Sequence, residues 1–280
     1  MQPNHIMPLA ISNILWPAAF DDAAHAAAKA AGADGIEVAP THIAPWAELT
    51  PEKLRAFRQR LAATGLAIPS LQAILFDRPD AKLLADTTAY KIFADHIALV
   101  AAYAAELGAT KMVLGAPKNR RRENLSIAAA MQVAAARLRP LAERVHSLGV
   151  ALVLEAVPPD YGGDFIHTAA EAAALVRMVD HPGLRLHLDT GALLLMQEDP
   201  AIIVAQHADI LAHVHISRPA LAAVTEALPL DHALATALTQ AHYQGWISIE
   251  ISAKDQPLEC LAQALAVTRT AYATALEPPI

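Results

Sequence analysis

Short apolar runs that are typical of strands alternate with longer segments of helical composition along the whole chain. The clearest strand lies at residues 185–189, where leucines alternate with His187 and Asp189 before the run stops at Gly191. Such alternation indicates a strand whose two faces meet different surroundings. The run therefore predicts a buried strand that presents a carboxylate at its carboxyl end, where the charge needs a partner or a bound cation.

Eight strands and eight helices are predicted in this way. The strands lie at residues 9–12, 35–38, 67–73, 111–115, 150–155, 185–189, 211–217 and 246–251. The helices lie at residues 21–31, 50–64, 87–107, 126–148, 168–180, 200–207, 231–243 and 258–276. Eight such repeats predict a (β/α)8 TIM barrel, formed by one domain that spans residues 1–280. A doubly wound open sheet is the alternative, but no glycine-rich nucleotide-binding turn follows the first strand.

Composition narrows the classes of function. The chain has a net charge of −7 and no basic tail or stripe, which argues against nucleic acid as a partner. Its single cysteine, Cys260, excludes an internal disulfide framework and a cysteine-based zinc cluster. No apolar run has membrane-spanning length, and the first residues do not resemble a signal peptide, so we expect a cytoplasmic protein without membrane contact.

The candidate chemistry lies at the ends of the last four predicted strands, because a TIM barrel carries its functional residues at the carboxyl ends of its strands. These ends hold Glu155, Asp189, His215 and Glu250, which follow one another at intervals of 34, 26 and 35 residues. Each interval is about one barrel repeat, so the four side chains should lie at similar height. One such carboxylate alone would be solvated, whereas four ligands in register suit one divalent cation: Mn²⁺ as first choice, with Mg²⁺, Co²⁺ or Zn²⁺ as alternatives.

Other polar residues are predicted near this set. His187 and His213 should lie one layer below Asp189 and His215, either as hydrogen-bond partners of the ligands or as ordinary core histidines. Six residues at strand ends or in the following loops are candidates for substrate binding: Asn13, Trp16, Glu37, Gln72, Lys118 and Arg120. The two basic residues could hold a phosphate or carboxylate, or belong to a solvated turn. The tryptophan could pack on a sugar ring or cap the barrel, and Glu37 could reach a substrate hydroxyl or pair inside the barrel.

A resemblance to a known family covers nearly the whole chain. The segments 35–38 (GIEV), 154–155 (LE), 187–191 (HLDTG), 213–217 (HVHIS) and 249–250 (IE) resemble the sugar phosphate isomerase/epimerase family. These are the xylose isomerase-like TIM barrels, which include endonuclease IV. In the ketose 3-epimerase branch the corresponding Glu, Asp, His and Glu bind a divalent metal, and the two glutamates act as acid and base. The resemblance implies these roles for Glu155, Asp189, His215 and Glu250, and it implies a homodimer.

Three positions depart from the ketose 3-epimerase pattern. Tyr161, Ala192 and Leu221 stand where that branch carries Glu, His and Arg. Contacts with the substrate should therefore differ from those of a free-ketose 3-epimerase. The missing histidine at position 192 also argues against an activity like that of endonuclease IV, in which this side chain binds a metal.

The residues predict a metal-dependent isomerase or epimerase whose partner is a small sugar, sugar phosphate or sugar acid. Glu155 and Glu250 would flank the substrate, one removing a proton next to a carbonyl to give an enediolate and the other returning a proton. Return to the opposite face gives an epimer, and return to the neighbouring carbon gives an aldose–ketose isomer. Two alternatives remain: a metal-dependent lyase, dehydratase or C-glycoside-cleaving subunit on the same scaffold, and a sugar-binding barrel without activity.

Overall fold

The strands of this computed structural model, which describes residues 7–253 and 255–272, form one parallel sheet in the order β2-β1-β8-β7-β6-β5-β4-β3. They are β1 (Leu9–Ser12), β2 (Gly35–Glu37), β3 (Ser70–Leu71), β4 (Lys111–Leu114), β5 (Ala151–Leu154), β6 (Leu184–Asp189), β7 (Leu211–Ile216) and β8 (Trp246–Ile249). Parallel bridges from Gly35 to Ala67 and from Val38 to Leu71 connect the two outermost strands. The sheet thus closes into the predicted (β/α)8 barrel, and the open-sheet alternative is wrong.

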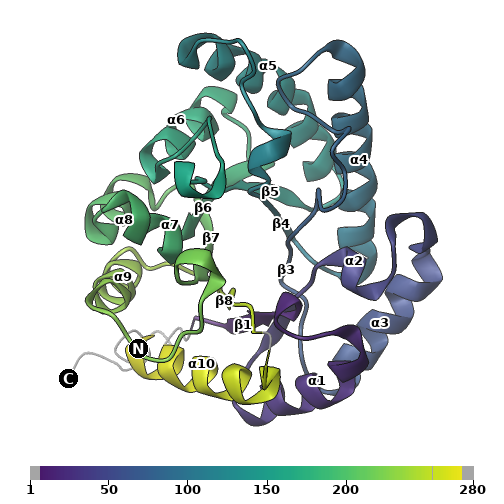
Figure 1. Cartoon of the computed structure of the whole chain (residues 1–280), viewed down its shortest axis with the longest axis vertical. Coiled ribbons are helices and arrows are strands. Elements are labelled where there is room, and N and C mark those ends of the chain that lie inside the picture. Colours follow the sequence, from purple (N-terminus) through teal and green to yellow (C-terminus); the bar gives the residue numbers. More distant parts are fainter. Residues whose placement is uncertain (1–6, 254, 273–280) are drawn as a thin grey trace.

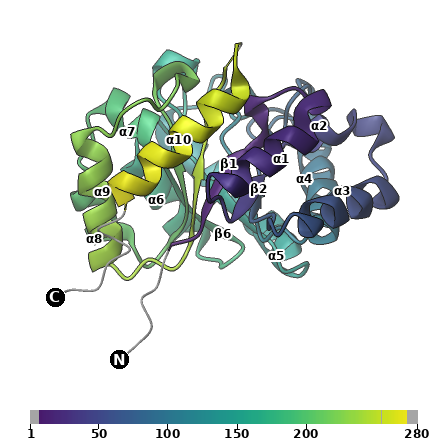
Figure 2. The same cartoon turned by 90° about the horizontal axis from the view of Figure 1, so that it is seen from below.

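Helices surround the strands as an outer ring (Figure 1). They are α1 (Asp21–Ala30), α2 (Pro40–Ile43), α3 (Pro51–Ala63), α4 (Thr87–Leu107), α5 (Ile127–His146), α6 (Ala169–Val179), α7 (Thr190–Met196), α8 (Pro200–His207), α9 (Pro229–Gln240) and α10 (Pro257–Tyr272). Seen from the side in Figure 2, α10 lies between α1 and α9 and packs against both. Within the described ranges, no helix combines the length and the apolar composition that crossing a membrane requires.

The predicted elements are present, with differences at a few ends. The third strand is only Ser70–Leu71 rather than 67–73, because this part of the chain joins β2 through isolated bridges. The short helices α2 and α7 were not predicted. The second of them begins directly after β6 because the Asp189 carboxylate accepts a hydrogen bond from the backbone N–H of Ala192 (2.7 Å) and so caps it. The predicted end of the last helix, residues 273–276, lies outside the described residues.

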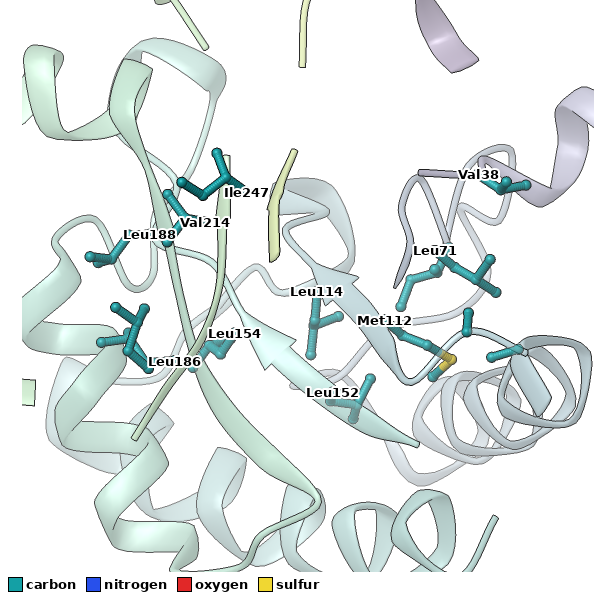
Figure 3. Packing of buried hydrophobic residues seen from close by; sticks show 14 of the residues in the cluster. Val38, Leu71, Met112, Leu114, Leu152, Leu154, Leu186, Leu188, Val214 and Ile247 are labelled. Atoms are coloured by element: carbon teal, nitrogen blue, oxygen red, sulfur yellow. The ribbon is translucent and has the colours of Figure 1, made fainter. Parts of the chain in front are cut away.

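Alternation along the strands separates an apolar layer from a polar one. Leu186 and Leu188 of β6 and Val214 of β7 are buried in the hydrophobic cluster (Figure 3). Successive strand residues point to opposite faces, so His187 and Asp189, which alternate with these leucines, face the inside of the barrel. Burying carboxylates and imidazoles there is costly unless they find partners, so the barrel interior is where a functional site is expected.

Candidate metal centre

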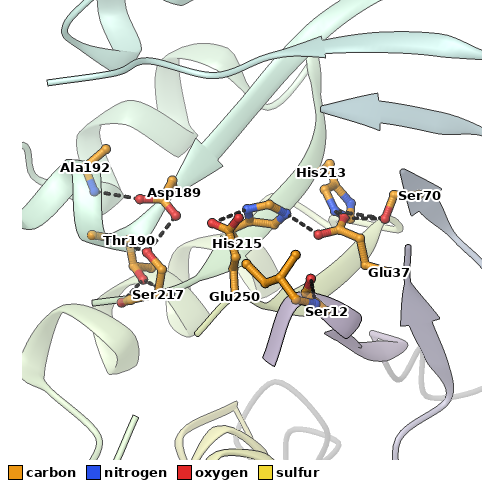
Figure 4. Close-up of polar contacts among 12 residues, drawn as sticks. Ser12, Glu37, Ser70, Asp189, Thr190, Ala192, His213, His215, Ser217 and Glu250 are labelled. Carbon is orange, nitrogen blue, oxygen red and sulfur yellow. Dashed lines mark hydrogen bonds and ion pairs between the residues drawn. The ribbon is translucent and has the colours of Figure 1, made fainter. Parts of the chain in front are cut away.

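Three potential metal ligands converge at the carboxyl end of the barrel. Asp189, His215 and Glu250 each offer one ligand atom, and these atoms lie within 4.8 Å of one another. Strand register brings them together: Asp189 pairs with His215 across β6 and β7, and Glu250 follows β8, where its N–H donates to the Ile216 carbonyl (3.0 Å). Figure 4 shows Asp189 and the Glu250 carboxylate on one side of the His215 ring and Glu37 on the other. Carboxylate and imidazole donors in this arrangement suit a divalent cation.

The Asp189 carboxylate is held in place by two hydrogen bonds. Its Oδ1 accepts from the backbone N–H of Ala192 (2.7 Å), and its Oδ2 accepts from the hydroxyl of Ser217 (2.6 Å). An ionised carboxylate has more acceptor sites than these two bonds use, so it can still bind a cation. This role of Ser217 was not predicted from the sequence. The signal for it is its position two residues after His215, directly past the end of β7, where strand alternation places both side chains on the same face.

The His215 ring links the mouth of the barrel to its interior. Its Nδ1 lies 3.3 Å from Glu250 Oε2, and its Nε2 lies 2.7 Å from Glu37 Oε1. Neither nitrogen has a partner with hydrogen-bonding geometry, although the residue is buried. Buried nitrogens normally have such a partner. An Nδ1 that faces a carboxylate oxygen without a hydrogen bond between them fits a pair of ligands to one cation.

The electrostatic interactions among these residues also favour a bound cation. Burial, together with the charges of Asp189 and Glu250, raises the pKa of Glu155 to about 8. Burial and the charge of Glu250 also raise the pKa of Asp189. Burial disfavours a charged His215, but the carboxylates of Glu37 and Glu250 outweigh it and raise the pKa of this imidazole well above its usual value. Several carboxyl groups thus share a poorly solvated space in which it is unfavourable to ionise all of them, and a bound cation would make their ionised forms favourable.

Glu37 lies inside the barrel, one layer below the converging ligands. Its Oε2 is 2.7 Å from His213 Nε2 and accepts a hydrogen bond from the hydroxyl of Ser70. Burial alone would raise its pKa, but His215 and His213 outweigh burial and hold it well below the usual range. A fully buried carboxylate 2.7 Å from His215 Nε2 is placed where acidic groups orient metal-binding histidines in other proteins. The Glu37 carboxylate contacts other protein groups and has no exposed surface that a substrate could reach.

The two histidines predicted for the inner layer differ in their contacts. His213 reaches His215 through the shared carboxylate of Glu37. His187 packs edge-on against the His215 ring, with ring centroids 4.2 Å apart, and neither of its nitrogens has a hydrogen-bond partner. Burial and the neighbouring His215 and His213 hold its pKa well below the usual value, so it is neutral. It therefore supports the His215 ring by packing and not by a hydrogen bond to Asp189.

Glu155 lies close to this cluster but outside its tightest part. It follows β5, its N–H donates to the Leu114 carbonyl (3.3 Å), and its carboxylate rests on Gly115. A Cβ at position 115 would lie only 2.2 Å from Glu155 Oε2, so any other residue there would displace the Glu155 carboxylate from this position. Together with Glu250 it lines a cavity of about 620 Å³. Its role as a fourth ligand stays a prediction.

Two of the predicted substrate contacts line this cavity. Gln72, which follows β3, is buried, and its side-chain oxygen has no hydrogen-bond partner in the described structure. An unpartnered amide oxygen at a cavity wall can accept a hydrogen bond from a substrate hydroxyl. Lys118 also lines the cavity, and its side chain is exposed.

Other predicted substrate contacts each make a hydrogen bond within the protein and do not line the cavity. Arg120 is buried, and its guanidinium donates to the backbone carbonyl of Glu155 (2.9 Å). The amide oxygen of Asn13 accepts from a backbone N–H just before α2 (2.8 Å). The indole of Trp16 is buried and donates to Asp21 (3.0 Å). That these three residues contact a substrate stays a prediction.

Comparison with known proteins places the fold in a family. A family model for the xylose isomerase-like TIM barrel matches residues 25–271. Among solved structures, D-psicose 3-epimerase in the presence of D-fructose is 18% identical, with a TM-score of 0.78 over 96% of this chain and 98% of that chain. L-ribulose 3-epimerase is 20% identical, with a TM-score of 0.80 over 96% of both chains.

A further solved structure, 3-keto-D-glucoside 4-epimerase YcjR from E. coli, is 18% identical, with a TM-score of 0.75 over 95% of this chain and 100% of that chain. At these identities the structural similarity establishes the fold alone. No curated protein matches the sequence.

Proposed function

Because this chain belongs to the xylose isomerase-like TIM barrel family, we propose that it is a divalent-metal-dependent isomerase or epimerase of a sugar. The observation that carries the proposal is the convergence of Asp189, His215 and Glu250 beside a cavity that Glu155 also lines. The names of two structural neighbours, D-psicose 3-epimerase and L-ribulose 3-epimerase, support the class of reaction and of substrate.

The residues that would hold the metal are Asp189, His215 and Glu250, with Glu155 as the fourth ligand. Their mixture of carboxylates and one imidazole favours Mn²⁺, with Mg²⁺, Co²⁺ or Zn²⁺ as alternatives. When bound, such a cation supplies Lewis acidity toward a substrate carbonyl and its neighbouring hydroxyl. Glu37 would hold the His215 ring in the orientation that this binding requires.

Proton transfer is assigned to Glu155 and Glu250. A general acid or base works best when its pKa is near the working pH, and burial beside other carboxylates raises the pKa of Glu155 to about 8. That value applies to the metal-free protein; a bound cation would lower the pKa and leave the Glu155 carboxylate ionised, as a base requires. Glu250 lines the same cavity and can exchange a proton with a substrate there. Between them, the two groups would remove the proton next to the carbonyl and return a proton to either carbon.

The direct test is exchange of a substrate hydrogen with solvent. We expect the Mn²⁺-loaded protein, incubated with a panel of sugars in heavy water, to place deuterium on a substrate carbon without loss of water. Glu155→Gln and Glu250→Gln should each lower this exchange at least about 100-fold. The control Glu143→Gln, exposed on α5, should leave it unchanged. Loss of water or cleavage of a glycoside would favour the lyase alternative, and binding without exchange would favour a sugar-binding barrel.

An anionic sugar is a narrower version of this proposal. Lys118 lines the cavity, so a phosphate or carboxylate on the substrate could bind there. We expect Lys118→Ala to raise the KM for an anionic substrate about tenfold, and to change the KM for a neutral sugar little. Arg121→Ala, which removes an exposed charge from the same loop, is the matched control. Equal effects of the two variants would contradict an anionic substrate.

A further inference from the structure

The cavity beside the proposed metal centre has an apolar wall in addition to its polar groups. Besides the carboxylates, its lining includes large apolar residues: Ile14, Ile74, Leu75, Phe76, Pro117 and Leu221. Its volume of about 620 Å³ lies well within the range of ~300–1000 Å³ that accommodates drug-sized ligands. Sugar hydroxyls need hydrogen-bonding partners, and these side chains offer none. The apolar side chains of this wall therefore favour a ligand that carries an apolar group.

Phe76 is the most exposed part of this wall, and its backbone is fixed. Its side chain is 63% exposed. Its N–H donates to the Ala73 carbonyl (2.9 Å), and its own carbonyl accepts from the indole of Trp46 (2.7 Å). An aromatic ring held at a cavity wall by such contacts, and left largely open, offers apolar surface that a ligand can cover.

Backbone strain also concentrates in this wall. Eleven non-glycine residues within residues 7–253 and 255–272 have a left-handed backbone. Four of them line the cavity: Ala73, Asp77, Ala116 and Leu221, with φ of 51°, 55°, 43° and 55°. Such conformations are unfavourable for residues with a Cβ and persist only where the surrounding structure imposes them. The shape of the wall is thus specified by the fold, as expected of a binding surface.

We propose that this wall binds an aromatic ring carried by the substrate, so that the substrate class is a sugar joined to an aryl group. The proposal rests on the proposed function, because the sugar part would lie between Gln72 and the two glutamates. A planar ring fits better than an alkyl chain, because it can stack on or meet edge-on the open ring of Phe76. Specificity for the aryl group is then set by Phe76 and its apolar neighbours, not by the metal.

The test compares two probes that differ in the apolar group alone. Phenyl β-D-glucopyranoside and methyl β-D-glucopyranoside are titrated into the Mn²⁺-loaded protein, and their Kd values are measured by calorimetry. Burying most of a phenyl ring should make the phenyl probe bind at least about tenfold more tightly. Phe76→Ala should reduce this preference to about twofold or less. Phe76→Leu, which keeps an apolar side chain but removes the ring, should lie between.

Phe20→Ala is the matched control, because Phe20 is 45% exposed and lies outside the cavity wall; it should retain the full preference. Equal affinities of the two probes, no binding of either, or equal effects of Phe76→Ala and Phe20→Ala would overturn the aryl proposal. Failure of the proposed function looks different: the protein would retain no metal, or would exchange no hydrogen on any sugar. Bound metal and exchange on free sugars, without a preference for the phenyl probe, would overturn the aryl proposal alone.

Discussion

Asp189 combines a structural and a proposed chemical role in one side chain. It is the last residue of β6, it caps α7 through the N–H of Ala192, and its second oxygen accepts from Ser217. An asparagine can keep the bond from Ala192 through its side-chain oxygen and can donate its amide N–H to the Ser217 hydroxyl, but it lacks the negative charge of the aspartate. Substitution by asparagine thus separates metal binding from helix capping.

We expect Asp189→Asn to weaken Mn²⁺ binding at least about 100-fold, because the outer partners of metal ligands alone contribute about 10–100-fold. The stability of the metal-free protein should change by less than about 1 kcal/mol, since asparagine is as good a helix cap as aspartate. Calorimetric titration and urea unfolding measure the two effects. Asp199→Asn is the control, because Asp199 caps α8 through a similar bond to Ala201 (2.8 Å) on the exposed surface. An unchanged Mn²⁺ affinity in Asp189→Asn contradicts its role as a ligand.

Glu155, as the proposed fourth ligand, should make metal binding depend on pH. Its pKa is raised to about 8 by burial and by Asp189 and Glu250, so the metal-free protein holds a proton there at neutral pH. Binding a cation must displace this proton, and affinity therefore falls as the pH falls below 8. Between pH 8 and pH 6 we expect the Kd for Mn²⁺ to rise at least about 50-fold. Glu155→Gln should flatten this dependence, and a Kd that is the same at both pH values would count against the proton-linked site.

Sequence patterns predicted which residues lie at strand ends, but not which of them reach the cavity. Glu37 and Gln72 follow the same pattern, a polar residue after an apolar one near a strand end. In the folded chain Glu37 finds His213 and His215, whereas the amide oxygen of Gln72 finds no partner and faces the cavity wall. The difference depends on whether side chains of other strands contact the residue. The sequence of a single strand therefore cannot predict which polar residue lines the cavity.

At the scale of single elements, Asp21 connects the first loops of the barrel. It begins α1, and its carboxylate accepts from the indole of Trp16 and lies 2.7 Å from His42 Nε2 of α2. Burial would raise its pKa, but the hydrogen bonds from His42 and Trp16 outweigh burial and lower it. A lowered pKa means that the ionised carboxylate stabilises the fold. This contribution is present above the usual aspartate pKa and is lost as the pH falls through the lowered value.

We expect Asp21→Asn to reduce the free energy of unfolding at pH 7 by about 1–3 kcal/mol, because it removes a charged acceptor from two buried donors. The difference from the wild-type protein should be smaller at pH 3 than at pH 7, because the stability that the ionised carboxylate contributes begins to be lost as the pH falls below the usual aspartate pKa of about 3.9. Urea unfolding at both pH values measures this. Asp22→Asn, at the exposed neighbouring position, is the control. A difference that stays constant between the two pH values would contradict the linkage.

Elements with a strong local signal were predicted well, and those fixed by tertiary contacts were not. The long helices α4 and α5 begin at side-chain caps, Asp86 and Ser126, and the first ends at the left-handed Gly108, all of which are visible in the sequence. By contrast, α7 begins within the run that predicted a stop at Gly191, because the capping carboxylate is also the last residue of the strand. The third strand is short because its pairing with β2 is reduced to isolated bridges.

At the scale of the whole molecule, the proposed ligands connect neighbouring strands. Asp189, His215 and Glu250 belong to the carboxyl ends of β6, β7 and β8, and Glu37 joins His215 to β2 across the barrel. A cation bound by these residues would connect strands that are distant in sequence. Since a ligand that binds only the folded state stabilises it, the barrel as a whole should be more stable with metal.

Removal of the metal should therefore lower the Tm. With free Mn²⁺ at about 100 times its Kd, stabilisation is about 2.7 kcal/mol, which for a chain of this size corresponds to about 5–10 °C. We expect a chelator to lower the Tm by this amount, and added Mn²⁺ to restore it. The Asp189→Asn variant should show little response to either. A wild-type Tm that does not respond to chelator or to Mn²⁺ would indicate that no cation is bound by the folded barrel.

The central claim is that one divalent cation lies between Asp189, His215 and Glu250. Anomalous diffraction from crystals soaked in Mn²⁺ tests it most directly, because the signal locates the ion itself. The account predicts one strong peak about 2.0–2.2 Å from a side-chain atom of each of these residues, with the Glu155 carboxylate completing the set. Well-ordered side chains with no peak between them, or a peak bound elsewhere in the barrel, would contradict it.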